Sequence, residues 1–159
     1  MKKIKYIEDL RILRNYFGNA GIDNIVLGGS LALQIYGILY DAQPHDIDIT
    51  IFVKAQERQR VKDILTELMK LAGGKLNTSY QNPPYTFHVG LNCTVVNVWV
   101  RTEENISDRT DILNIEIEPD FRLNVYDPAT CLIMKAGLGR EKDLKYANKL
   151  INKLTSFAV

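Results

Sequence analysis

Two aspartates stand in a run of isoleucines, in the stretch Asp46-Ile-Asp48-Ile-Thr-Ile-Phe. Apolar and polar residues alternate there with the period of a β-strand, so the strand would bury its isoleucines and present both carboxylates on the opposite face. At about 3.3 Å rise per residue the two side chains start roughly 6.5 Å apart, and like charges this close are unfavourable without a positive group between them. The pattern therefore favours a bound divalent cation, and carboxylates prefer hard ions such as Mg²⁺ or Mn²⁺.

A turn that could bind phosphate precedes the aspartates. Gly28, Gly29 and Ser30 join the short apolar run 25–27 to a run of helix formers that ends near Gly37. Because glycine has no side chain, the backbone can approach a ligand closely, and the free N–H groups at a helix start bind phosphate. Ser30 adds its hydroxyl to such a site or caps the helix. Taken separately, the turn and the carboxylates could also be a bare turn and surface decoration.

The order and spacing of the two features are more specific than either alone. The Gly28-Gly29-Ser30 turn followed by the Asp46-Ile-Asp48 strand resembles the signature of the nucleotidyltransferase superfamily typified by DNA polymerase β. The resemblance implies an α/β (α+β) fold, in which helices pack on a mixed, twisted β-sheet and two C-terminal helices close one side. It further implies that the turn grips a nucleoside triphosphate such as ATP, that the aspartates hold Mg²⁺ or Mn²⁺, and that a nucleoside monophosphate is transferred.

Asn97 departs from the pattern of this superfamily, which carries a third carboxylate on a later strand. The run Val95-Val96-Asn97-Val98-Trp99 has the form and place expected for it, but with an amide. Asn is a poor strand residue, so it is interpreted either as a buried structural amide or as the occupant of the third catalytic position. An amide oxygen can ligate a metal, yet it brings no negative charge and takes no proton. We expect Asn97 on a strand next to the aspartates, directed into the same cleft.

This departure leaves three functions open. The chain is a nucleotidyltransferase with weakened activity, a degenerate relative that binds nucleotide or a protein partner without turnover, or a plain interaction module. The acceptor is equally open, since a protein, a transfer RNA, an antibiotic and another small molecule all fit the pattern. Glu103, Glu104 or Asp108, in the polar stretch 101–111 that we expect to be a mobile loop, could supply a missing carboxylate.

Basic residues gather towards the C-terminus. Lys135, Arg140 and Lys142 stand in the pattern Lys-x4-Arg-x-Lys-Asp. That pattern resembles the closing segment of small bacterial nucleotidyltransferases, including the toxin-like and antibiotic-modifying branches, which implies that these side chains face the nucleotide phosphates. The alternative is a solvated basic helix end, in which Asp143 pairs locally.

Composition bounds these possibilities. The chain has 159 residues, 46% of them hydrophobic, and its 20 basic and 19 acidic residues give a formal net charge of +1. This predicts one domain over residues 1–159 and no global preference for nucleic acid or membranes. Cys93 and Cys131 stand among apolar residues without metal-ligand spacing, which predicts buried free thiols. With no signal peptide and no apolar span, we expect a soluble, cytoplasmic protein; a homodimer or a protein partner stays open.

The periodicity also predicts the elements that position these residues. Helices are expected over 5–19, 30–36, 55–72, 129–137 and 140–155, and strands over 25–27, 46–52, 75–80, 85–89, 93–100, 112–117 and 121–126. The Asp127-Pro128 pair predicts an N-cap followed by proline in the first helical turn.

Overall fold

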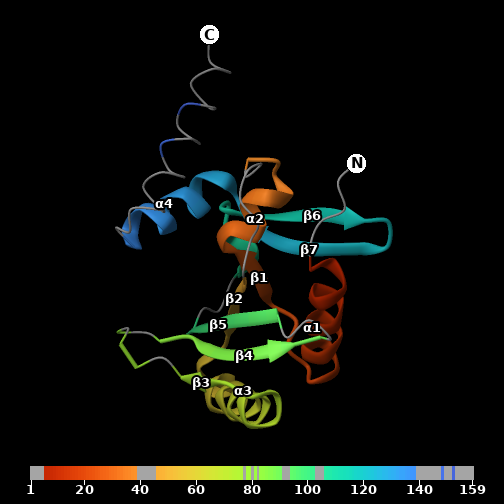
Figure 1. Cartoon of the computed structure of the whole chain (residues 1–159), viewed down its shortest axis with the longest axis vertical. Helices are drawn as coiled ribbons and strands as arrows, with labels where there is room; N and C mark the ends of the chain where they lie inside the picture. Colours follow the sequence, from red (N-terminus) through yellow and green to blue (C-terminus); the bar gives the residue numbers. More distant parts are fainter. Residues whose placement is uncertain are drawn as a thin grey trace.

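The computed structural model describes residues 6–38, 46–76, 78–79, 81, 83–90, 94–102, 106–138, 148 and 152. Within these residues, seven strands form one sheet in the order β3-β4-β5-β2-β1-β7-β6 (Figure 1). The strands are β1 (Ile25–Gly28), β2 (Asp46–Val53), β3 (Lys75–Leu76), β4 (Tyr85–Val89), β5 (Thr94–Thr102), β6 (Ile112–Glu118) and β7 (Phe121–Tyr126). The helices are α1 (Ile7–Asn19), α2 (Gly29–Ile35), α3 (Arg58–Ala72) and α4 (Pro128–Leu138), with short 3-10 helices η1 (Ala55–Glu57) and η2 (Ile106–Asp108).

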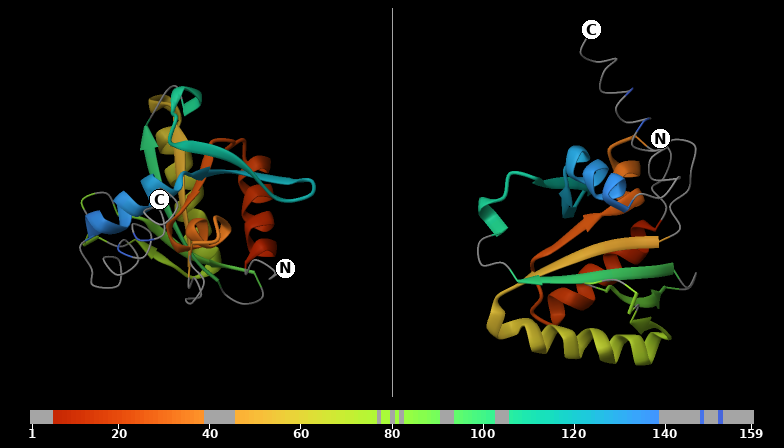
Figure 2. Two further views of the ribbon diagram at one scale, coloured as in Figure 1. Left: turned by 90° about the horizontal axis from the view of Figure 1, so that it is seen from above. Right: turned by 90° about the vertical axis from the view of Figure 1, so that its left-hand side faces the viewer.

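The sheet is mixed, and β2 lies at its middle. β2 pairs antiparallel with β1 and parallel with β5, while β1 pairs parallel with β7. The parallel partner β5 is reached through α3 and the hairpin strands β3 and β4, as a crossover between parallel strands requires. Figure 2 shows α3 along one side of the strands and α2 with α4 on the other. The mixed α/β architecture confirms the fold class predicted from the sequence.

The alternation of β2 has the predicted effect on burial. Ile47, Ile49 and Ile51 are at most 3% exposed and belong to the main hydrophobic core, whereas Asp46 and Asp48 between them are half-buried. α3 packs its apolar stripe against the same core, with Val61 and Leu65 fully buried and the neighbouring apolar residues partly buried. Burial of the isoleucines fixes the register of β2, because a shift by one residue would place the carboxylates in the core.

Three predicted boundaries are wrong. Arg101 and Thr102 were expected in a loop, but they extend β5 and pair with the end of β2. Their pairing with a buried strand outweighs their polarity, since ladder hydrogen bonds do not depend on the side chain. The helix predicted over 55–72 begins as η1 and becomes α3 only at Arg58, and the strand predicted over 75–80 is β3, Lys75–Leu76.

Some predictions fall on residues that the structure does not describe. The helix expected over 140–155 lies outside the described residues except for Asn148 and Asn152, which are helical. Cys93 also lies outside them, whereas Cys131 is a buried free thiol as predicted. No helix in the described ranges combines the length and the apolar character that a membrane crossing needs.

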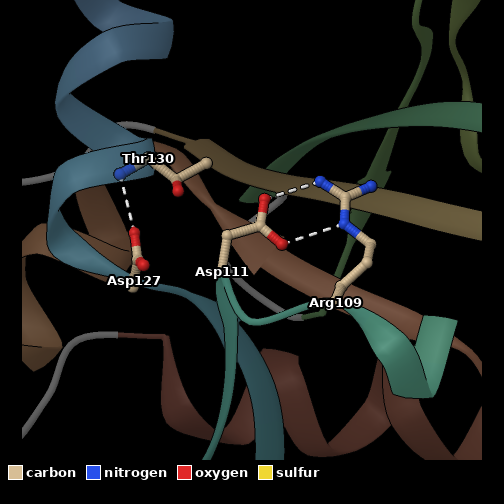
Figure 3. A network of polar contacts seen from close by, with 4 residues as sticks. All are labelled: Arg109, Asp111, Asp127 and Thr130. Atoms are coloured by element: carbon tan, nitrogen blue, oxygen red, sulfur yellow. Dashed lines mark hydrogen bonds and ion pairs between the residues drawn. The ribbon is translucent and has the colours of Figure 1, made fainter.

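Figure 3 shows two polar contacts near the start of α4, the hydrogen bond between Asp127 and Thr130 and the pair of Arg109 with Asp111. The Asp127 carboxylate accepts a hydrogen bond from the backbone N–H of Thr130 at 2.7 Å, which confirms the predicted N-cap. The backbone N–H of Asp127 donates to the carbonyl of Asp111 at 2.8 Å. Asp111 itself receives two hydrogen bonds from the Arg109 guanidinium, at 2.9 and 2.6 Å. The segment before β6 and the helix after β7 are thus joined.

Candidate active site

The register of three strands brings the separate sequence signals to one place. In the centre of the sheet, Asp48 of β2 lies opposite Gly28 of β1 on one side and opposite Asn97 of β5 on the other. Because alternate residues of a strand point to the same face, Asp46 lies on the face of Asp48 and Asn97. The turn, the carboxylate pair and the amide, up to 69 residues apart in the chain (97 − 28), therefore meet in the middle of the sheet.

The Asn97 side chain binds both carboxylates at once. Its amide nitrogen donates to Asp46 Oδ2 at 3.0 Å and to Asp48 Oδ1 at 3.1 Å. Both hydrogens of the NH2 group are thereby used, since an amide nitrogen carries two donors. The geometry places Asn97 where the sequence predicted it, beside the aspartates and on their face; a role in catalysis stays a prediction.

Thr86 completes this arrangement and was missed from the sequence. Its hydroxyl donates to Asn97 Oδ1 at 2.7 Å, from the neighbouring strand β4. All four members of the cluster that we call the acid cluster, Asp46, Asp48, Thr86 and Asn97, are half-buried. A signal did exist: strands 85–89 and 93–100 were predicted on either side of the short turn 90–92, and such a hairpin places position 86 close to position 97.

The glycine turn touches the acid cluster directly. Gly28 ends β1 and Gly29 begins α2, with no residue between strand and helix. Gly29 has φ +67°, and a Cβ built there would collide with the Asp48 carboxylate. At Gly28 a Cβ would lie 3.2 Å from the ring of Tyr126 on β7. Only glycine allows this backbone to pass so close to Asp48, which agrees with a turn made for close approach.

The end of α2 is fixed to β7 by Tyr36. Its hydroxyl donates to the backbone carbonyl of Tyr126 at 3.0 Å. Burial raises the pKa of Tyr36 to about 12, with Cys131 and Asp127 adding to the effect. The phenol therefore keeps its proton, and its role as donor, throughout the neutral pH range. This contact holds the helix that carries Ser30, whose predicted phosphate role stays a prediction.

The charge of the acid cluster is not balanced within it. Two carboxylates meet one neutral amide, and among the described residues no group of three or more Asp, Glu, His or Cys side chains could hold a metal. Both carboxylates nevertheless aim at one positively polarised group. A divalent cation with oxygen ligands fits this donor set, because Mg²⁺ commonly uses one or two carboxylates together with substrate phosphates.

A second polar group on the C-terminal half of the chain is balanced. We call Arg109 and Asp111 the arginine pair. The Arg109 guanidinium lies 5.0 Å from the centre of the Phe52 ring and 5.8 Å from the centre of the Tyr126 ring. The hydrogen bonds from Arg109 lower the pKa of Asp111 below its ordinary value of 3.8. This stretch was expected to be mobile, and instead Arg109 and Asp111 are anchored on the sheet.

The structure does not describe the side chains of the basic residues that were predicted to face the phosphates. Lys135 belongs to α4. The side chain of Lys135, together with all of Arg140 and Lys142, lies outside the described residues. The same holds for Glu103 and Glu104. Asp108 is described in η2 and is not a member of the acid cluster.

Comparisons with known proteins find solved structures of similar fold. The sequence matches no protein family and no curated protein. Solved structures do match. Lincomycin-bound LnuA, a lincosamide antibiotic adenylyltransferase, is 14% identical over 91% of this chain and 95% of its own, with TM-score 0.62. ANT(2″)-Ia in complex with adenylyl-2″-tobramycin is 10% identical over 92% and 88%, with TM-score 0.58.

A third solved structure is also similar. It is an antigenic nucleotidyltransferase-like protein from Paracoccidioides brasiliensis, 15% identical over 91% of this chain and 74% of its own, with TM-score 0.53. Identities this low establish a shared fold. The chain therefore has the nucleotidyltransferase fold, as its sequence motifs predicted.

Proposed function

We propose that this chain is a nucleotidyltransferase that binds a nucleoside triphosphate with Mg²⁺ and moves the nucleoside monophosphate to an acceptor. The observation that carries the proposal is the convergence of Asp46 and Asp48 on a single amide group, beside a glycine turn that leaves room for nothing larger. Two carboxylates held this close favour a bound cation, because like charges at short range repel each other.

Each part of the site has an assigned task in this proposal. The backbone of Gly28, Gly29 and Ser30 binds phosphate oxygens, helped by the N–H groups at the start of α2. Asp46 and Asp48 hold Mg²⁺, which when bound offsets phosphate charge and orients the leaving group. Lys135, Arg140 and Lys142 neutralise the remaining phosphate charge.

The reaction is an in-line displacement at the α-phosphorus. An acceptor oxygen or nitrogen forms a bond to this phosphorus while the bond to the bridging oxygen breaks and pyrophosphate leaves. The acceptor must also lose a proton. Asn97 cannot take it, since an amide is no base at neutral pH, so the proton passes to solvent water unless Glu103, Glu104 or Asp108 supplies the base. A nucleotidyltransferase built this way is slow with an alcohol acceptor and faster with one that ionises readily.

Asn97 also favours a second function. If the missing base and the missing negative charge prevent turnover, the chain binds nucleotide or a protein partner without chemistry. Both functions keep Asp46 and Asp48 as metal ligands and differ only in whether pyrophosphate is produced.

A transfer assay separates the two functions. The purified protein is incubated with each α-³²P-labelled nucleoside triphosphate and Mg²⁺ or Mn²⁺, and pyrophosphate release and label transfer are measured. Asn97→Asp is compared with the unaltered chain, and Asp46→Asn/Asp48→Asn is the inactive control. We expect measurable pyrophosphate release that rises in Asn97→Asp and vanishes in the control. Nucleotide binding without pyrophosphate release, in both the unaltered chain and Asn97→Asp, supports the non-catalytic function.

A further inference from the structure

The orientation of the Asn97 amide suits two anions and does not suit a cation. Its NH2 group faces Asp46 and Asp48, and its carbonyl oxygen faces the Thr86 hydroxyl. An amide nitrogen has no free lone pair to offer a metal, so this orientation presents the wrong atom to Mg²⁺. As long as the amide stays in this orientation, its NH2 group takes the place of a positive charge between the carboxylates.

We propose that Thr86 is a positioning residue that lets the Asn97 amide turn by half a rotation when a cation binds between the carboxylates. The inference rests on the proposed function, since it requires Mg²⁺ at Asp46 and Asp48. After the turn, the carbonyl oxygen of Asn97 faces the cation and its NH2 group faces Thr86. The side-chain amide torsion is broad and roughly two-fold, so both orientations are accessible without moving the backbone.

The Thr86 hydroxyl can form a hydrogen bond with the Asn97 amide in both of its orientations. Thr86 Oγ1 can donate to a carbonyl and can equally accept from an N–H, because a hydroxyl carries one donor and two acceptor lone pairs. At 2.7 Å from Asn97 it is within hydrogen-bond distance for either direction. A residue that could only donate would leave an amide N–H without a partner after the turn, and an unsatisfied half-buried donor is costly.

The surroundings of Thr86 hold its position. The residue lies opposite Asn97 in the β4–β5 pairing. At Gly74, next to β3, even a Cβ would collide with the Thr86 carbonyl, so the chain packs tightly against the backbone of β4. A carboxylate at position 97 would need no turn, because both its oxygens accept. The role assigned to Thr86 is thus specific to a chain that carries Asn at this position.

The first test observes the amide itself by NMR. The side-chain ¹⁵N–¹H2 signals of Asn97 are assigned by their loss in Asn97→Asp, and are then followed on adding Mg²⁺ with a non-hydrolysable ATP analogue. We expect both proton signals to move out of the range of N–H groups bound to carboxylates. Signals that keep carboxylate-bound shifts while nucleotide binds would overturn the inference and leave the proposed function intact. A chain that binds no Mg²⁺–nucleotide would contradict the proposed function itself.

The second test uses linkage between stability and binding. Thr86→Val removes the hydroxyl at similar volume, and Thr86→Ser keeps it as the matched control. If Thr86 serves both amide orientations, Thr86→Val lowers the denaturation midpoint equally with and without Mg²⁺–nucleotide, and the Kd stays within about twofold. If Thr86 serves only the metal-free orientation, the loaded form loses nothing and Thr86→Val binds about fivefold tighter, the effect of one net hydrogen bond. That second result would contradict the proposal, as would a Thr86→Ser variant that behaves like Thr86→Val.

Discussion

The acid cluster and the arginine pair solve the same problem in opposite ways. In the arginine pair, one carboxylate meets one guanidinium through two hydrogen bonds, and the charges cancel. In the acid cluster, the amide that binds both carboxylates is neutral, so the four residues of the cluster carry net negative charge among themselves. A balanced pair needs nothing more and serves the fold. Two like charges this close favour a cation beside them, which is the reason to look for function there.

The largest expected effect follows from removing the unbalanced charge. Replacing Asp46 and Asp48 together by Asn should abolish Mg²⁺-dependent nucleotide binding, a loss of at least about 100-fold, because both proposed metal ligands are lost. Stability should stay the same or rise, because a like-charge repulsion disappears. Isothermal titration and urea unfolding measure the two quantities. Nucleotide binding that survives with Mg²⁺ would rule out the metal role of these aspartates.

The close approach of the turn to the acid cluster should be the next most sensitive feature. Gly29→Ala adds a Cβ against the Asp48 carboxylate at a positive φ, so we expect a loss of ~2 to 3 kcal/mol in the free energy of unfolding. Gly18→Ala is the matched control, because a Cβ there meets nothing within 4 Å and α1 favours alanine. Chemical denaturation measures the free energy of unfolding of both variants. Equal stability of the two would mean that the backbone at Gly29 adjusts freely.

A third negative charge should make the imbalance worse. Asn97→Asp replaces the donor between Asp46 and Asp48 by an acceptor, so without metal we expect a loss of ~1 to 2 kcal/mol in the free energy of unfolding. Mn²⁺ should restore the lost stability, and it should bind more tightly to the variant than to the unaltered chain. Thermal unfolding with and without Mn²⁺ tests this expectation. A variant that loses stability and regains none with Mn²⁺ would identify Asn97 as a structural amide only.

Removing the charge of Asp111 in the arginine pair should have the smallest effect on stability, and this effect should depend on pH. Because the folded-state pKa of Asp111 is lowered, its stabilising contribution is complete above the ordinary value of 3.8 and is lost as the pH falls below that value. Both side chains are partly exposed, so we expect only ~0.5 to 1 kcal/mol for Asp111→Asn at pH 7. The difference from the unaltered chain should shrink steadily below pH 4 in acid unfolding. A difference that does not change with pH would assign the effect to packing rather than to charge.

The strength of each sequence signal explains which features could be predicted. The alternation in β2 determines both the buried and the polar face, so Ile47, Ile49 and the aspartates were placed correctly. The glycine turn was predictable because few residue types allow it. Thr86 was not found, since a threonine in a strand is ordinary and its importance arises only from its position opposite Asn97. The anchoring of Arg109 depends on rings of Phe52 and Tyr126 from distant strands, which no local pattern reveals.

The hairpin of β4 and β5 has a consequence for the order in which the chain folds. The Thr86–Asn97 hydrogen bond spans 11 residues, whereas the bonds from Asn97 to Asp48 and Asp46 span 49 and 51. Local contacts close small loops and generally form earlier, so we expect the hairpin to align Asn97 before β2 arrives in parallel beside it. In stopped-flow refolding, Thr86→Val should then slow folding, while Ile49→Val should mainly speed unfolding. The nascent hairpin would thus carry one half of the site to an aspartate strand that joins it last.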